Sequence, residues 1–243
     1  LSKYHDIADN LGSFYYLYLD RPDTFALQVR DVKTDSIWQV NVAALTRPEW
    51  VANLEARYEY KEPNPPYELT FPDSLPNTAV LAIHTLYENR FLDAGLKYRK
   101  VFRKVFKKIR KEKTDQLILD LRNNGGGATA MLYEIFPYFA FEREDRPIMK
   151  SYNVNSGKDY FRPFPKPRKK AFSGKVIVLI SPTTFSNSTV LTNYLRAFYP
   201  NTTVIGQESA GCYSRFTASN KRHFHLPNSG IEIRIPTQNK NYF

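Results

Sequence analysis

The sequence predicts an α/β fold, because short apolar runs of strand length alternate along the chain with longer segments of helical periodicity. Residues 116–121 (QLILDL) and 176–180 (VIVLI) are two such runs, each followed by turn residues. Apolar residues recur at helical spacing in residues 97–113 and again in residues 190–198, where Pro200 ends the pattern. Alternation of this kind is typical of α/β cores.

The first part of the chain has a different pattern. Residues 14–19, 25–30 and 37–42 are three strand-like runs separated by turn residues, which predicts an antiparallel meander. The prolines of residues 62–66 (EPNPP) then interrupt any regular structure. The sequence therefore predicts two domains, a small, mostly antiparallel β module of residues 1–65 and an α/β core of residues 66–243.

Much of the net charge of +11 lies in the segment 97–113. A basic helix of this kind can bind nucleic acid or an anionic membrane surface. The commoner case is a helix that packs on a sheet and keeps its Lys and Arg residues in water, and no recognised nucleic-acid motif accompanies this segment. We expect such packing and no nucleic-acid partner, with one apolar stripe facing the core: Val101, Phe102, Val105, Phe106 and Ile109.

Three consecutive glycines, Gly125, Gly126 and Gly127, follow the apolar run 116–121. Glycine has no side chain, so the backbone can take a positive φ and its N–H groups can approach a ligand closely. This arrangement suits an anion or oxyanion site at the end of a strand. Taken alone, the stretch is equally consistent with a tight turn into the next helix.

Ser186 lies between the run 176–180 and the helix that follows it. A serine at a helix N-terminus can act as an attacking hydroxyl, because the helix dipole and the free N–H groups stabilise negative charge nearby. The alternative is an ordinary helix N-cap, which Ser186, Asn187 or Ser188 could provide.

Taken in series, three segments resemble the C-terminal processing serine peptidases, a family that includes the tail-specific proteases and the tricorn protease core. Residues 120–127 (DLRNNGGG) resemble the strand-and-glycine motif of that family, and residues 184–188 (TFSNS) resemble its nucleophile segment. Residues 204–211 (VIGQESAG) resemble the segment that follows the nucleophile helix. The resemblance covers residues 77–243 and implies a layered ββα-spiral core of the Clp-protease and crotonase type.

The resemblance also implies an activity. The protein would be a serine endopeptidase that cleaves proteins or peptides near their C-termini through an acyl-enzyme, with no cofactor. Ser186 would attack the peptide carbonyl, and the backbone N–H groups of Gly126 and Asn187 would hold the oxyanion. Relatives of this kind imply a periplasmic, cell-envelope or secreted location.

The general base is the point at which the chain departs from the family pattern. In the tail-specific branch a lysine beyond the nucleophile serves as base, at a place that falls near Gly211 and Cys212 here. No lysine occurs between Arg196 and Lys221. The Ser–Lys dyad is therefore absent from its usual place.

Tricorn-like members instead use a histidine from an earlier strand, and residues 77–86 resemble that strand and contain His84. An imidazole suits the role because its unperturbed pKa of ~6.5 lies close to working pH. The alternative is a hydrogen-bonded core histidine. If His84 is not the base, Glu208 and Ser209 are the next candidates for orienting a proton acceptor.

The missing lysine keeps a second function class open, a catalytically inactive relative that acts as a peptide-binding module. A metal site is not expected, because His223 and His225 share one strand face without a third and fourth ligand nearby. Cys212 is the single cysteine, which excludes an internal disulfide. The sequence contains no run of about 18 apolar residues, so it predicts no transmembrane helix.

Overall fold

The structure is a computed structural model, and it describes residues 22–57, 65–141, 148–213 and 215–242. The described residues fall into two compact units, residues 22–57 and residues 65–242. The domain boundary between residues 65 and 66 stays a prediction.

The smaller unit contains an antiparallel hairpin and a helix. Strands β1 (Thr24–Arg30) and β2 (Ile37–Ala43) pair along their whole length, in agreement with two of the three predicted runs. The third run, residues 14–19, lies outside the described residues. Helix α3 (Arg47–Arg57) was not predicted from the sequence.

A capping box explains where α3 begins. The Thr46 N–H and hydroxyl both donate to a carboxylate oxygen of Glu49, at 2.8 and 2.7 Å. A threonine followed three residues later by a glutamate is a recognised helix start signal. The sequence therefore carried a start signal for this helix, although the meander prediction passed over it.

The larger unit is built on a five-stranded sheet with the strand order β3-β4-β5-β8-β9. Strands β4, β5, β8 and β9 run parallel, and β3 joins the β4 edge in the antiparallel direction. The strands are β3 (Tyr67–Thr70), β4 (Thr78–Ile83), β5 (Gln116–Asp120), β8 (Lys175–Ile180) and β9 (Thr202–Gly206).

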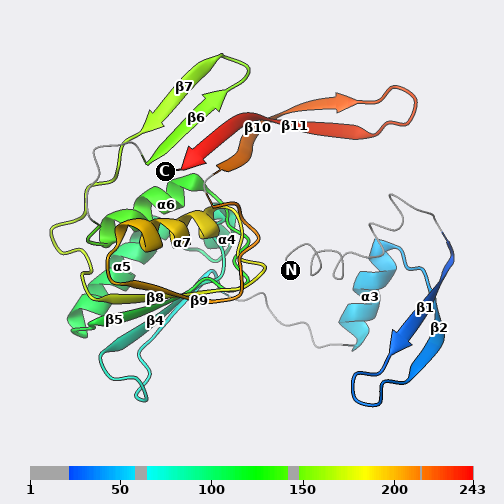
Figure 1. Cartoon of the computed structure of the whole chain (residues 1–243), viewed down its shortest axis with the longest axis horizontal. Helices are drawn as coiled ribbons and strands as arrows, with labels where there is room; N and C mark the ends of the chain where they lie inside the picture. Colours follow the sequence, from blue (N-terminus) through cyan, green and yellow to red (C-terminus); the bar gives the residue numbers. More distant parts are fainter. Residues whose placement is uncertain (1–21, 58–64, 142–147, 214, 243) are drawn as a thin grey trace. The chain divides into compact units, whose positions relative to one another are not determined.

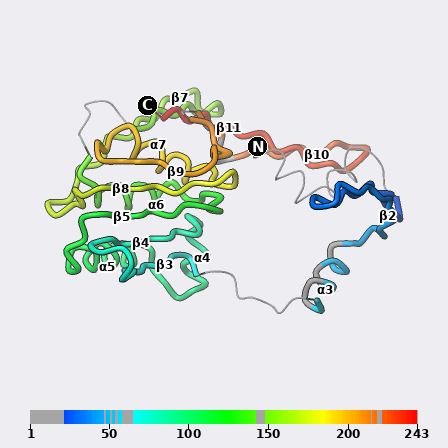
Figure 2. The backbone as a smooth tube through the Cα atoms, turned by 60° about the horizontal axis from the view of Figure 1, so that its bottom comes forward, coloured from blue at the N-terminus to red at the C-terminus, as the bar shows by residue number. Residues whose placement is uncertain are grey.

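Helices of the larger unit gather on one face of this sheet (Figures 1 and 2). The basic segment 97–113 forms α5, and its predicted apolar stripe is buried while its Lys and Arg side chains are exposed. The packing prediction for this segment is thus confirmed. The helices are α4 (Glu88–Asp93), α5 (Tyr98–Lys111), α6 (Thr129–Ile135), the short 3-10 helix η1 (Phe136–Tyr138) and α7 (Asn187–Phe198).

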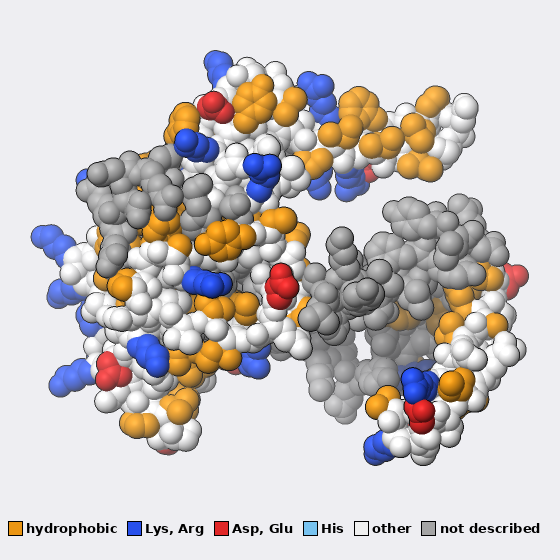
Figure 3. All heavy atoms as spheres, viewed as in Figure 1, with side chains coloured by type: hydrophobic (Ala, Val, Ile, Leu, Met, Phe, Trp, Pro, Cys, Tyr) orange, Lys and Arg blue, Asp and Glu red, His pale blue; other side chains and the backbone are white. Residues whose placement is uncertain are grey.

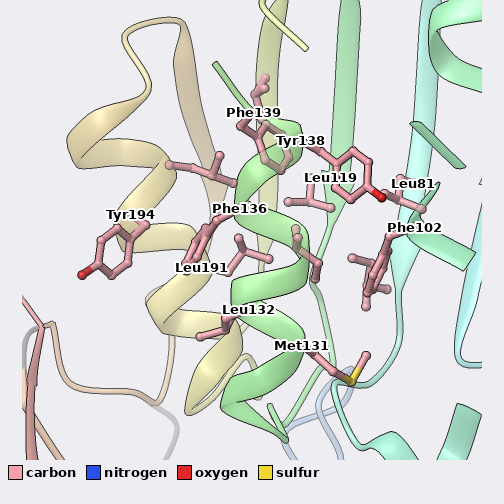
Figure 4. Packing of buried hydrophobic residues seen from close by; sticks show 14 of the residues in the cluster. Leu81, Phe102, Leu119, Met131, Leu132, Phe136, Tyr138, Phe139, Leu191 and Tyr194 are labelled. Carbon is pink, nitrogen blue, oxygen red and sulfur yellow. The ribbon is translucent and has the colours of Figure 1, made fainter. Parts of the chain in front are cut away.

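The core lies between the sheet and these helices. Strand side chains alternate, so Leu117 and Leu119 of β5 are fully buried while Ile118 points to the other face and is half-buried. Figure 4 shows the packed layer, with Leu119 on the sheet side and Leu132 of α6 beside Leu191 of α7. Burial of this kind is the main stabilising term for the sheet and holds its helices in place.

A second, four-stranded antiparallel sheet has the order β10-β11-β6-β7. At its far end the β10–β11 ribbon exposes Phe224, Ile233 and Ile235. Figure 3 shows apolar side chains gathered over this ribbon. At its near end it adjoins the helices, because the Tyr194 hydroxyl of α7 donates to the Ile148 carbonyl. The strands are β6 (Met149–Asn153), β7 (Lys158–Arg162), β10 (Arg215–His225) and β11 (Glu232–Tyr242).

The mixed α/β architecture confirms the fold class predicted from the sequence. Within the described ranges, no helix combines the length and the apolar character needed to cross a membrane.

Candidate active site

The predicted glycine and serine segments meet at the carboxyl edge of the parallel sheet. The glycine loop follows β5 and the serine follows β8, and these two strands are neighbours. A Cβ atom at Gly126 would lie 2.7 Å from the Ser186 Cβ and 2.7 Å from the Phe185 carbonyl oxygen. Gly126 also has a φ of +92°. Both the space and the backbone conformation therefore require glycine at this position.

Ser186 has an unusual backbone conformation, with φ 53° and ψ −124°. It occupies the N-cap position of α7, but its side chain makes no cap hydrogen bond. The N-cap alternative for the Ser186 side chain is therefore wrong. A strained serine at a sharp strand-to-helix turn resembles the nucleophile elbow of other hydrolases, which presents the hydroxyl for reaction.

Asn124 organises the loop, and no sequence pattern distinguishes it from its neighbour Asn123. Its side-chain amide donates to the Ile83 carbonyl at 2.7 Å, and its side-chain oxygen accepts the Gly126 N–H at 2.9 Å. Its own carbonyl accepts the Phe185 N–H at 3.0 Å. Asn124 is 0% exposed. The buried Asn124 side chain thus joins the end of β4 to the glycine loop, and its backbone carbonyl joins that loop to the serine loop.

The two predicted oxyanion donors lie together. The Asn187 backbone nitrogen is 3.0 Å from where a Gly126 Cβ would be, and as the first residue of α7 its N–H has no acceptor within the helix. The Gly126 N–H already donates to Asn124 Oδ1. It can hold an oxyanion only by sharing or releasing that hydrogen bond.

The Asn187 side chain extends the same arrangement. Its amide nitrogen donates to the Gly127 carbonyl at 2.5 Å and to Thr129 Oγ1 at 3.3 Å. Gly127 in turn forms a bridge with Leu86, beyond the end of β4. The glycine loop is therefore fixed from both sides.

His84 follows β4 at the same edge of the sheet. Its ring nitrogen Nε2 lies 3.2 Å from Glu68 Oε1, and its side chain is 27% exposed. The core-histidine alternative is wrong, because the ring is on the face opposite the buried Ile83 and reaches solvent. No hydrogen bond joins His84 to Ser186 in this structure.

A charged group lies near His84. Burial favours the neutral form of the Asp120 carboxyl, but hydrogen bonds from Arg122 outweigh this effect and lower its pKa. Protonation of the nearby His84 ring lowers the pKa of Asp120 further. His84 therefore lies within electrostatic reach of one carboxylate and within hydrogen-bonding distance of another, that of Glu68.

The reserve candidates lie beside α7. Ser209 Oγ is 3.4 Å from Thr189 Oγ1, while Glu208 is exposed. Neither is hydrogen bonded to Ser186. The chain here passes very close to the helix, since a Cβ at Gly211 would lie 2.4 Å from Thr189 Oγ1.

The histidine pair on β10 takes part in a surface ion pair. His223 Nδ1 lies 2.5 Å from Glu232 Oε1 on the adjacent strand. Among the residues that the structure describes, no three His, Cys, Asp or Glu side chains are grouped to hold a metal ion.

Sequence reasoning missed a buried lysine near the site. Lys240 of β11 is 9% exposed, and its Nζ lies 3.5 Å from Thr129 Oγ1, which the Asn187 side chain also contacts. Burial lowers the pKa of Lys240, and the nearby charge of Arg162 lowers it further. No local sequence signal marks Lys240, because strand pairing far along the chain brings it here.

The comparisons with known proteins agree with this geometry. A family model described as peptidase family S41 matches residues 77–239. The fold is similar to that of mature CPAF, with a TM-score of 0.55 and 15% identity over 90% of this chain and 59% of that one. It is also similar to a putative S41 protease from Bacteroides fragilis NCTC 9343, with a TM-score of 0.51 and 15% identity over 90% of this chain and 54% of that one.

The chain thus spans less than two thirds of the length of either solved structure. No curated protein sequence matches it significantly.

Proposed function

The chain belongs to peptidase family S41, and we propose that it is a serine endopeptidase that hydrolyses peptide bonds through an acyl-enzyme. Ser186 Oγ gives its proton to a base and attacks the carbonyl carbon of the substrate. The resulting oxyanion is held by the N–H groups of Asn187 and Gly126. Collapse of this intermediate expels the amine, which takes up the proton, and water then hydrolyses the acyl ester.

The close approach of Gly126 to Ser186 is the observation that carries this proposal. The positive φ of Ser186 is unfavourable for a residue with a side chain, and Gly126 lies so close to Ser186 that no residue with a Cβ would fit there. Strain of this kind persists only where the surrounding structure imposes it, and it gathers at active sites. A simple turn between a strand and a helix needs neither feature.

His84 is the proposed base. It lies at the same sheet edge as Ser186, and its position two residues before Leu86 connects it to the glycine loop. To accept the proton of Ser186, the ring must leave Glu68 and turn towards the serine. Hydrogen bonds in unliganded sites are often long and tighten only when substrate binds.

A serine-reactive fluorophosphonate tests the catalytic proposal. The unmodified protein is expected to become labelled, and Ser186→Ala is expected to lose all labelling. Ser188→Ala is the matched control, because the Ser188 hydroxyl is buried without a hydrogen-bond partner among the described residues. Absence of labelling on a folded, unmodified protein would support the inactive, peptide-binding alternative, which none of the comparisons favours.

The pH dependence of labelling tests the base. With His84 as base, labelling should be slower at acidic pH, because a protonated imidazole cannot accept the proton of Ser186. His84→Gln should flatten this profile and slow labelling by roughly 10²–10⁴-fold. His225→Gln, at an exposed site on β10, is the control. An unchanged profile in His84→Gln would eliminate His84 as the base.

Two finer proposals come from family resemblance. We propose cleavage near the C-termini of its substrates, and a periplasmic, cell-envelope or secreted location. Mass spectrometry of digested peptides would show where the cuts fall, and cell fractionation would show the location. Cleavage sites spread evenly along a peptide would contradict the first proposal. Recovery of the protein in the cytoplasmic fraction alone would contradict the second.

A further inference from the structure

Lys240 and Arg162 form a pair of positive charges that has no acidic partner in the part of the chain that the structure describes. Among the described residues, neither takes part in an ion pair, and Lys240 is almost fully buried. Burying an ammonium group without a counter-charge is strongly unfavourable. Such groups are commonly neutralised by a bound ion of opposite charge or retained for function.

The pairing of β11, β6 and β7 brings these two cations to one face of the sheet. Lys240 is opposite Ser151, while Tyr242 is opposite Met149, which in turn is opposite Arg162. Residues two apart on a strand share a face, so both rows point the same way. Ser151, Met149 and Tyr242 are buried there. This face therefore carries a lysine, an arginine and two hydroxyl groups.

Helix α6 covers the same face. The Arg162 guanidinium lies 5.0 Å from the centre of the Tyr133 ring, and the Tyr242 hydroxyl is hydrogen bonded to Thr129. Burial raises the pKa of Tyr242 to about 12, so this hydroxyl stays neutral at working pH. Neutral hydroxyl groups and cations together favour an anion over a cation.

Lys240 still has hydrogen-bonding capacity. An ammonium group has three donors, and among the described residues the Lys240 ammonium makes one hydrogen bond, the long one to Thr129 Oγ1. That oxygen also accepts from the Asn187 side chain. The Thr129 side chain thus links the Lys240 ammonium group to Asn187, the residue that follows Ser186.

We propose that Lys240 and Arg162 bind a carboxylate of the peptide substrate beside the Ser186 loop. This inference rests on the proposed peptidase function and adds a substrate class, peptides with a negative charge close to the cleaved bond. A carboxylate can bridge an ammonium and a guanidinium with charge-assisted hydrogen bonds. The charge can come from the free C-terminus or from an Asp or Glu side chain.

A different role for Lys240, as proton acceptor for Ser186, fits the geometry less well. A base needs to be within hydrogen-bonding distance of the hydroxyl that it deprotonates, directly or through one water. Lys240 Nζ instead contacts Thr129. The adjacent Arg162 suits a site for an anion.

Binding of fluorescent peptides to the Ser186→Ala protein tests the proposal without requiring catalysis. Three related peptides are compared: one with a free C-terminus, the same peptide amidated, and the amidated peptide with one residue near its end replaced by Asp. Lys240→Met and Arg162→Gln remove the charges in turn, and Lys150→Met removes an exposed lysine from the neighbouring strand β6 as the control.

At least one carboxylate peptide is expected to bind more tightly than the neutral amide, and the comparison of the two identifies the source of the charge. Lys240→Met should weaken binding of that peptide by roughly tenfold to a hundredfold, as expected for the loss of a charged hydrogen bond. Binding of the neutral peptide should not change. Arg162→Gln, at an exposed position, should have a smaller effect in the same direction. Lys150→Met should have none.

Equal affinity for all three peptides, or an equal loss for all three in Lys240→Met, would overturn the proposal. The second result would assign Lys240 a structural role or an action on the nucleophile. Thermal unfolding of each variant shows whether it is folded, and Arg162→Gln keeps the test open if Lys240→Met is not. Failure of the peptidase proposal is recognised separately, as an unmodified protein that fluorophosphonate does not label.

Discussion

The two sheets of the larger unit contribute to the site in different ways. The parallel sheet carries Gly126 and Ser186 on loops directly after β5 and β8, so the groups proposed to react come from short strand–loop–helix segments. The antiparallel sheet contributes Lys240 and Arg162 through pairing of strands distant in sequence. The backbone geometry of the site is thus determined largely by short local segments. The positive charge beside it depends on the pairing of strands that are distant in sequence.

The two sheets also differ in burial. One face of the parallel sheet is packed against helices, and Leu81, Leu119 and Val178 are buried there. The far part of the β10–β11 ribbon has exposed side chains on both strands. Substitutions in the parallel sheet should therefore be costly, and most substitutions in the far part of the ribbon should not. Four experiments test this contrast.

Gly126→Ala should have the largest effect. Its Cβ would collide with the Phe185 carbonyl and the Ser186 side chain, and φ would be unfavourable for alanine. We expect fluorophosphonate labelling to fall by roughly 10²–10³-fold, as for loss of an oxyanion donor. Gly125→Ala is the matched control, because a Cβ there meets nothing within 4 Å. Equal labelling of the two variants would show that the close approach has no role in the site.

Leu119→Ala should have the next largest effect. Leu119 is 0% exposed in the centre of the core, and removing such a side chain costs about 2–5 kcal/mol. Ile118→Ala, one residue earlier on the half-buried face, should cost clearly less. Denaturant unfolding measures both free energies. Equal losses would mean that the open face of the parallel sheet is packed as tightly as the helix-covered face.

Asn124→Ala should destabilise the protein through unmet hydrogen bonds. The substitution leaves the Ile83 carbonyl and the Gly126 N–H without their partner, at a cost of about 1–3 kcal/mol for each buried group. Asn123→Asp is the control, since Asn123 is exposed, its side chain accepts a single hydrogen bond from Thr183, and aspartate tolerates its φ of 61°. Thermal unfolding should show a lower midpoint for Asn124→Ala alone. A similar shift in both variants would contradict the role given to Asn124.

Glu232→Gln, on the ribbon, should have the smallest effect. Hydrogen bonds from Arg234 and then His223 lower the pKa of Glu232 from its ordinary value of 4.5. The stabilisation from such an acid is present above that value and is lost as pH falls through the lowered pKa. Because the group is exposed, solvent screens the interaction. We therefore expect the unfolding midpoint of Glu232→Gln to equal that of the unmodified protein at every pH between pH 3 and pH 7. A clear shift would show that the ribbon is covered in solution.

Much of the parallel half of the molecule could be predicted from the sequence. The apolar runs 116–121 and 176–180 became β5 and β8 with at most a one-residue change at their ends. The stripe of α5 was recognised because one helical face was apolar throughout. The placement of Ser186 at the start of α7 followed from the same local pattern.

Other features could not be predicted. The role of Asn124 depends on the carbonyl of Ile83, 41 residues earlier in the chain. The hydrogen bond of His84 to Glu68 depends on antiparallel addition of β3 to the sheet edge. No periodicity within a single segment indicates which distant group a polar side chain will meet.

By itself, then, the sequence determined the α/β class, the two central strands β5 and β8, and a glycine loop and a serine at strand ends. These features depend on hydrophobic periodicity and on backbone conformations that specific residues allow, which are local properties. The tertiary structure alone decided that Gly126 touches Ser186, that Asn124 joins the two loops, and that a buried lysine lies nearby. Those contacts arise from strand pairing and burial, which bring together residues that the chain keeps far apart.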